Sequence, residues 1–318
     1  MRRQESEAKS RRQASRASTR RGEREAPSAE DKPPWKPPPR QFPRTCEIPE
    51  QSPLYWVQQR DRYVRQLLIY DIEAITKRRL LVYFASQSEE DAAIDSRDVA
   101  YLCEIWGDVG NDPVDLLVET PGGYTDATEG LVSFIQSRSR DFRVIVANAA
   151  KSNGTLLCLA AKAIVMGAVS ELGPIDPQIR GIPCTILQTP EIRKQNFVLH
   201  QTGVYALQQT RSLAEKLLSK GMMKGVSPKR IKRVVRALST RERFFSHGSV
   251  IDHKEASALG LKVVYLPPED EFWRRIWLLY CMYDFDLRRN RFLKIVEARV
   301  RSTAIAAPSP TAGDSGSP

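Results

Sequence analysis

Histidine is scarce in this chain, and cysteine never occurs in the close pairs that hold metal ions. The 318 residues include three histidines and five cysteines, and no two cysteines form a Cys-x-x-Cys pair. Structural zinc sites usually draw on such pairs, and disulfide frameworks on an even set of cysteines. We therefore expect no metal, no cofactor and no disulfide framework, and a reducing, cytoplasmic compartment fits this cysteine content best.

Long hydrophobic segments are also missing. The longest apolar stretch, residues 155–169, contains Lys162 and is shorter than the ~20 residues that a membrane-spanning helix needs. The Arg-rich N-terminus is not followed by the hydrophobic segment of a secretory signal. The sequence thus predicts a soluble chain without a transmembrane segment.

Positive charge is plentiful but unevenly placed. Lys and Arg outnumber Asp and Glu by 49 to 38, a formal net charge of +11. Residues 1–50 hold 13 basic and 8 acidic residues, and residues 211–243 hold 11 basic and two acidic residues. Such local charge predicts that the positive charge lies on the N-terminal tail and on one basic surface helix over residues 228–243. Nucleic acid or an anionic membrane surface is the partner that the basic tail would suit.

Composition divides the chain into three parts. Residues 1–51 lack apolar periodicity and end in a cluster of prolines, which predicts a disordered, basic, Pro-rich tail. Residues 52–285 contain the periodic apolar segments of a folded domain. Residues 286–318 are predicted as the basic end of a helix followed by a second disordered tail.

Within the folded domain, predicted strands and helices alternate. Short apolar runs at 79–84, 114–119, 143–147 and 163–166 predict strands, and helical spacing predicts helices at 95–108, 126–138 and 155–161 between them. Helices dominate after residue 195, with a last strand at 261–266 and an aromatic-rich helix at 269–285. Near-continuous apolar strands that alternate with helices indicate an α/β fold with a parallel sheet covered on both faces.

Two loops could carry chemistry because each follows a predicted strand and precedes a predicted helix. They are the segments 119–123 (ETPGG) and 150–155 (AKSNGT). Open α/β sheets place ligands at the carboxyl ends of their strands. A serine in one loop and backbone N–H groups from a Gly-Gly pair in the other could form a nucleophile and an oxyanion hole. Taken singly, the loops read as an ordinary turn and a helix N-cap.

Three segments identify a family. The runs 116–123 (LLVETPGG), 147–167 (ANAAKSNGTLLCLAAKAIVMG) and 170–178 (SELGPIDPQ) resemble the serine dehydrogenase proteinase family, a soluble relative of signal peptide peptidase A. The resemblance covers residues 75–270 approximately, including 245–266. It implies a ClpP/crotonase-like parallel sheet with flanking helices, a serine peptidase that acts on peptide or protein substrates, and assembly into a homo-oligomer.

The resemblance also implies a set of site residues. Ser152 would be the nucleophile, and the backbone N–H groups of Gly123 and Asn153 would form the oxyanion hole. Lys194 would be the base of a Ser-Lys dyad. Lys216 is a second choice of base.

A histidine base is the remaining alternative. The histidine of a ClpP-type triad would fall near Asp176, where this chain has no histidine. His247, paired with Asp252, is therefore an alternative base. The chain also departs from the family's Met-Ser-Ala-Gly-Thr pattern, because Lys151 stands directly before the serine.

Three other functions stay open. A catalytically inactive member of the fold would use the same groove to bind peptides or serve as a scaffold. A crotonase-type acyl-CoA enzyme would share the oxyanion hole, although it needs no serine nucleophile. A nucleic-acid-associated protein would act through its basic tail.

Overall fold

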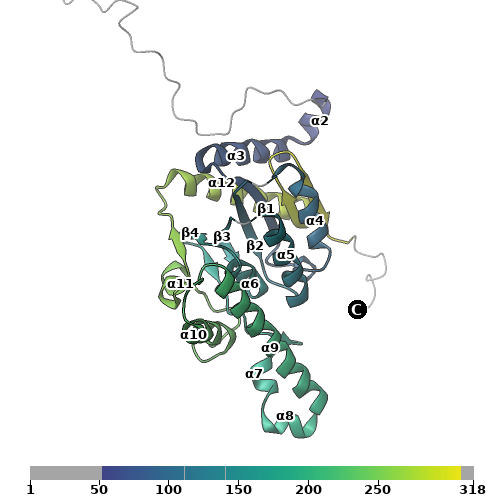
Figure 1. Cartoon of the computed structure of the whole chain (residues 1–318). Helices are drawn as coiled ribbons and strands as arrows, with labels where there is room; N and C mark the ends of the chain where they lie inside the picture. Colours follow the sequence, from purple (N-terminus) through teal and green to yellow (C-terminus); the bar gives the residue numbers. More distant parts are fainter. Residues whose placement is uncertain (1–51, 111, 140, 309–318) are drawn as a thin grey trace, which may run out of the picture. The chain divides into compact units, whose positions relative to one another are not determined.

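The computed structural model of the chain describes residues 52–110, 112–139 and 141–308 (Figure 1). The tail predicted for residues 1–51 lies outside these residues. In the described part, no helix is long and apolar enough to cross a membrane.

The described part is built on an eight-stranded sheet. Its strand order is β10-β9-β1-β2-β3-β4-β8, with β5 paired to the end of β3. Strands β1, β2, β3, β4 and β8 run parallel, whereas β9 is antiparallel to both β1 and β10. The strands of the sheet are β1 (Arg79–Ala85), β2 (Val114–Thr120), β3 (Phe142–Ala150), β4 (Ile164–Met166), β5 (Glu171–Leu172), β8 (Val263–Tyr265), β9 (Phe292–Glu297) and β10 (Ser302–Ala306). A separate hairpin joins β6 (Gln178–Ile179) to β7 (Ile182–Pro183).

Helices connect the strands and cover the sheet. The α-helices are α2 (Pro53–Gln58), α3 (Arg60–Thr76), α4 (Asp98–Ile105), α5 (Thr125–Arg138), α6 (Asn153–Leu159), α7 (Cys184–Leu187), α8 (Pro190–Gln195), α9 (Phe197–Lys220), α10 (Pro228–Ser239), α11 (His253–Leu259) and α12 (Glu271–Asn290). Two short 3-10 turns, η2 (Glu90–Ala92) and η3 (Trp106–Asp108), flank α4. These elements confirm the predicted mixed α/β architecture.

Each face of the sheet has its own hydrophobic core. Every residue of β1 and β2 is buried, and neighbouring side chains point to opposite faces. Leu81 and Val118 belong to the core under α4, α5, α6, α9 and α10, whereas Val82 and Leu117 belong to the core under α3 and α12. Burial on both faces explains why these strands read as continuous apolar runs.

The C-terminal boundary predicted at residue 285 is wrong, because the sheet continues past it. Helix α12 runs to Asn290, and β9 and β10 then extend the sheet beyond β1. Residues 309–318 lie outside the described part. Strand β9 is hard to recognise in the sequence because it buries two charged residues, Lys294 and Glu297. The Lys294 ammonium lies 2.8 Å from the Asp98 carboxylate, and Glu297 lies 2.8 Å from the Arg65 guanidinium.

Helix α10 carries the predicted basic surface. Its apolar residues Ile231, Val234, Val235 and Leu238 are buried, and its Lys and Arg side chains are exposed. The amphipathic helix is therefore present, while its partner stays a prediction. Helices α7 and α8 pack on α9 around a small separate core of Cys184, Leu187 and Leu207.

Candidate active site

Ser152 occupies a strained turn at the carboxyl end of β3. Its backbone has φ 50° and ψ −117°, a conformation that non-glycine residues rarely adopt. The Thr155 hydroxyl stabilises the turn: it donates to the Ala150 carbonyl at 2.7 Å and accepts from the Gly173 N–H at 2.9 Å. The surrounding structure thus holds Ser152 in a conformation that costs energy, which is common at functional sites.

The loop after β2 approaches this turn closely. Gly122 has φ 106°, and a Cβ atom built on it would lie only 2.8 Å from the Ser152 Cβ. The Lys151 N–H donates to the Thr120 carbonyl at 3.0 Å, which ties the two loops together. The two predicted loops therefore meet, and the approach requires glycine at position 122.

Two backbone N–H groups beside Ser152 are free to bind a ligand. Within the described ranges, no hydrogen bond uses the N–H of Gly123 or of Asn153. The Gly122 carbonyl accepts from the Ile94 N–H at 2.7 Å, so the N–H of the same trans peptide, that of Gly123, points away from Ile94. The Asn153 side chain donates to the Gly123 carbonyl and links the two residues.

The predicted lysine bases lie apart from the serine. Lys194 is an exposed residue of α8. Lys216 is also exposed and lies 3.2 Å from Glu129 on α5. Lys151, directly before the serine, turns to Glu171 with an Nζ–Oε1 distance of 2.7 Å. Across the described residues, no side-chain nitrogen is hydrogen-bonded to the Ser152 hydroxyl.

The structure pairs His247 with Asp176 instead of Asp252. The His247 Nδ1 lies 2.7 Å from the Asp176 Oδ1, and the Arg241 Nε donates to the other carboxylate oxygen at 3.3 Å. The predicted partner, Asp252, caps α11 by accepting from the N–H groups of Lys254 and Glu255.

Asp176 lies on a loop that begins beside the Ser152 turn. A Cβ built on Gly173, three residues before Asp176, would lie 3.4 Å from the Ser152 backbone nitrogen. One short loop thus connects the surroundings of Ser152 to the His247–Asp176 pair.

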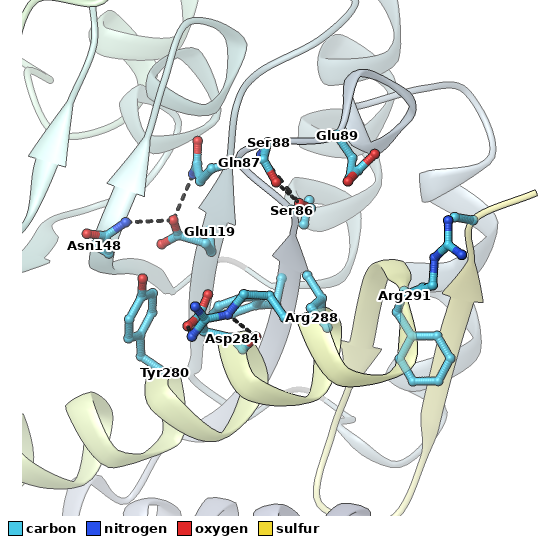
Figure 2. Close-up of a pocket in the computed structure, with 15 residues that line it drawn as sticks. Ser86, Gln87, Ser88, Glu89, Glu119, Asn148, Tyr280, Asp284, Arg288 and Arg291 are labelled. Atoms are coloured by element: carbon cyan, nitrogen blue, oxygen red, sulfur yellow. Dashed lines mark hydrogen bonds and ion pairs between the residues drawn. The ribbon is translucent and has the colours of Figure 1, made fainter.

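Glu119 is not among the predicted site residues, although it is the next-to-last residue of β2, the strand that leads into the Gly122 turn. Its side chain faces α12, into a cavity on that side of the sheet (Figure 2). Burial raises the pKa of Glu119 to about 7, and hydrogen bonds from Ala149, Asn148 and Gln87 oppose that rise. The available signal was a carboxylate directly after the apolar run Leu116–Val118.

Comparison with known proteins adds a family and two relatives. Residues 95–301 match the model of a family described as ClpP-like SDH-type serine proteinase. The chain is 30% identical over 167 residues to "Uncharacterized protein MJ0137" of Methanocaldococcus jannaschii, which is 50% of this chain and 56% of that protein. It is 34% identical over 90 residues to "Uncharacterized protein MJ1495" of the same organism, covering 28% and 31% of the two chains. The matches thus span about half of the first relative and a third of the second.

Proposed function

We propose that this chain, which belongs to the ClpP-like SDH-type serine proteinase family, hydrolyses peptide bonds with Ser152 as its nucleophile. The observation that carries the proposal is the meeting of the Ser152 turn with the Gly122–Gly123 turn, which brings a strained serine next to two free N–H groups. Family membership supplies the substrate class, protein or peptide.

The reaction follows from the positions of these groups. The Ser152 Oγ attacks the carbonyl carbon of the scissile peptide and gives its proton to a base, which later passes it to the leaving amine. The negative oxygen of the tetrahedral intermediate accepts hydrogen bonds from the Gly123 and Asn153 N–H groups. Water then attacks the acyl-enzyme ester by the same steps and releases the second product.

His247 is the base that the geometry supports best. A buried carboxylate on Nδ1 fixes the imidazole tautomer and leaves Nε2 to accept the serine proton. The Lys194 and Lys216 side chains are exposed, and Lys216 pairs with Glu129, so neither lies in the buried setting of a Ser-Lys dyad. We therefore prefer a Ser152–His247–Asp176 arrangement to the Lys194 dyad.

His247 is hydrogen-bonded to Asp176 and not to Ser152 in the described part of the chain, so the proposed reaction requires His247 and Ser152 to approach each other. Catalytic hydrogen bonds are often long without substrate and shorten in the Michaelis complex. His247 lies in the segment between α10 and α11, outside regular secondary structure. Movement of this segment would bring its Nε2 to the serine.

A second candidate function is peptide binding without catalysis. The observation in its favour is that no nitrogen among the described residues is hydrogen-bonded to the Ser152 hydroxyl. The free N–H groups of Gly123 and Asn153 would then hold a peptide that is not cleaved.

Labelling with a fluorophosphonate probe separates these candidates. Wild type should be labelled and Ser152→Ala should not. His247→Ala should react at least about 100-fold more slowly, the usual contribution of a general base. Lys194→Ala should react like wild type. Loss of labelling in Lys194→Ala with normal labelling in His247→Ala would replace the proposed base by the dyad. An unlabelled, folded wild type that still binds peptides would establish the non-catalytic function.

A further inference from the structure

The cavity that Glu119 faces opens beside the candidate active site, on the face of the sheet that α12 covers. It has a volume of about 450 Å³ and lies between the end of β1, the loop that follows it, and the C-terminal half of α12. Figure 2 shows Glu119, Asn148 and Gln87 along one side, Tyr280 next to them, and Asp284 with Arg288 across the opening. Nothing in the proposed mechanism uses this cavity.

The innermost polar group of the cavity is the Glu119 carboxylate, which is only 2% exposed. Its Oε1 accepts from the Gln87 side chain at 2.7 Å and the Asn148 side chain at 2.9 Å. Its Oε2 accepts from the Ala149 N–H at 2.9 Å. All three donors are neutral, and a carboxylate has room for about four hydrogen bonds.

The absence of a cation distinguishes Glu119 from the other buried carboxylates. In the part of the chain that the structure describes, each of the others lies within 4 Å of a Lys, Arg or His nitrogen. They are Asp98 with Lys294, Asp115 with Arg78 and Arg143, Asp176 with Arg241 and His247, and both Asp286 and Glu297 with Arg65. A buried charge without a partner is costly, so this fold pairs its buried carboxylates except the one that faces a cavity.

The walls of the cavity suit a cation. Tyr280 and Phe84 present aromatic surface, with ring centroids 5.5 Å apart, which attracts cationic groups. The charge of Arg288 is neutralised by Asp284 on the same helix. The Gln87 side chain, which covers Glu119, is exposed on a loop, and a ligand cation that took its place would exchange a neutral hydrogen bond for a stronger charge-assisted one.

We propose that this cavity binds an alkylammonium or alkylguanidinium group with Glu119 as its counter-ion, and that the occupant is a Lys or Arg side chain of the peptide substrate. The choice of occupant rests on the proposed peptidase function. A smaller hollow, lined by Gln87, Ser88 and Glu89 as well, continues to Gly122 and Gly123. A peptide held at the Gly123 N–H therefore has a route along this loop into the cavity.

Binding of the cation should depend on pH. The ionised carboxylate is the binding form, and burial places the pKa of Glu119 at about 7 in the free protein. Other titratable or charged groups that line the cavity are Tyr280, Asp284 and Arg288 on α12, Arg291 after it, and Glu89 on the loop. Burial raises the pKa of Tyr280 to about 12, so it stays neutral at physiological pH. Affinity should fall about tenfold from pH 8 to pH 6 as Glu119 takes up a proton.

The direct test is calorimetric titration of the full chain with n-butylguanidinium, beside n-butanol as a neutral probe with the same butyl chain. We expect butylguanidinium to bind and butanol not to bind. Glu119→Gln should weaken butylguanidinium at least tenfold, because a neutral amide replaces the counter-ion. Glu89→Gln, which removes an exposed carboxylate from the same cavity, should change the affinity less than threefold. Equal binding by wild type and Glu119→Gln, or no binding by wild type, would overturn the proposal.

A second variant keeps the test valid if Glu119→Gln fails to fold. Gln87→Ala removes the amide that covers the carboxylate and keeps the charge, so it should bind butylguanidinium at least as tightly as wild type. A large loss of affinity in this variant would contradict a site built on the Glu119 charge.

Peptide cleavage distinguishes the two sources of the cation. Peptides with a single Lys or Arg should be cleaved at least tenfold more efficiently than matched peptides in which norleucine replaces that residue. Glu119→Gln should abolish this preference for a cationic side chain. If butylguanidinium binds but cleavage shows no preference, the occupant is a free small cation and the substrate assignment is wrong. If butylguanidinium binds and no peptide is cleaved, the cation site in the cavity is supported and the proposed peptidase function is wrong.

Discussion

Strand β2 carries a buried carboxylate near each end, and the two have opposite surroundings. Asp115 lies at the amino end, 1% exposed, where Arg78 and Arg143 each approach to 2.6 Å. Glu119 lies at the carboxyl end, 2% exposed, and accepts hydrogen bonds from neutral donors only. Both side chains point to the same face of the sheet, because they are four residues apart on one strand.

The difference separates the end of the sheet where arginines pair with a buried carboxylate from the end that carries the proposed active site, which we call the functional end. At the amino end, Arg78 and Arg143 pair with the buried Asp115 carboxylate. At the carboxyl end lie the strained Ser152, the close approach of Gly122, the free N–H groups and the cavity with its unpaired carboxylate. Energetically costly features gather where parallel sheets bind their ligands.

Neutralising the two carboxylates should have very different effects on stability. Asp115→Asn removes the ion-pair partner of Arg143 and leaves Arg78 with Asp141 alone, so we expect the free energy of unfolding to fall by about 3 to 5 kcal/mol. Glu119→Gln removes a buried charge that has no cation beside it, which favours folding, but its amide N–H group then faces another hydrogen-bond donor, which opposes folding. These effects should leave the free energy of unfolding within about 1 kcal/mol of wild type at pH 8. Urea denaturation of both variants at pH 8 measures the contrast. Equal losses would show that the two ends are built alike.

Gly122→Ala tests the close approach at the functional end. The new Cβ would meet the Ser152 Cβ at 2.8 Å and the Lys151 carbonyl at 2.9 Å, at a φ that disfavours alanine. We expect a loss of about 2 to 3 kcal/mol in stability, together with loss of probe labelling. Gly181→Ala is the control, because it has φ 77° and no atom within 4 Å of the new Cβ. It should cost about 1 kcal/mol and keep labelling. Equal losses from both substitutions would mean that backbone conformation alone matters.

The core of the fold could be predicted from the sequence, whereas its last strands could not. Strands β1 to β4 are buried and mostly apolar, and helix α9 lies in the region after residue 195 where helices were predicted, since local periodicity determines both. Strand β9 was not predicted because its charged residues Lys294 and Glu297 are expected at the surface when judged by hydropathy. Their partners, Asp98 and Arg65, are about 200 residues away in sequence. Burial of a charge depends on such distant partners, and a single sequence does not reveal them.

The site divides in the same way. The Ser152 and Gly122 turns follow recognisable strand ends, so their meeting at one edge of the sheet was predictable. The partner of His247 was not, because Asp176 lies 71 residues away and the nearer Asp252 is used as a helix cap. The unpaired state of Glu119 was hidden too, since it depends on which side chains from β3 and α12 surround it.

Titration should reveal the cost of the unpaired carboxylate. Burial raises the pKa of Glu119 from 4.5 to about 7, so the folded chain binds a proton more tightly than the unfolded chain. Stability from this group is present below pH 4.5 and is lost as the pH rises to 7. We expect wild type to lose about 2 kcal/mol relative to Glu119→Gln across that window. Parallel stability curves for the two proteins in urea between pH 4.5 and 8 would contradict a raised pKa at this position.

Lys216→Ala should have the smallest effect, because its ion pair lies outside both ends of β2. The Lys216 and Glu129 side chains are about half exposed, and exposed pairs contribute less than about 1 kcal/mol. We expect unfolding within this range of wild type and an unchanged rate of fluorophosphonate labelling. Glu129→Ala is the matched control and should give the same small change. A fall in labelling of 100-fold or more in Lys216→Ala alone would make this lysine the base, and the functional end of the sheet would then have to include α9.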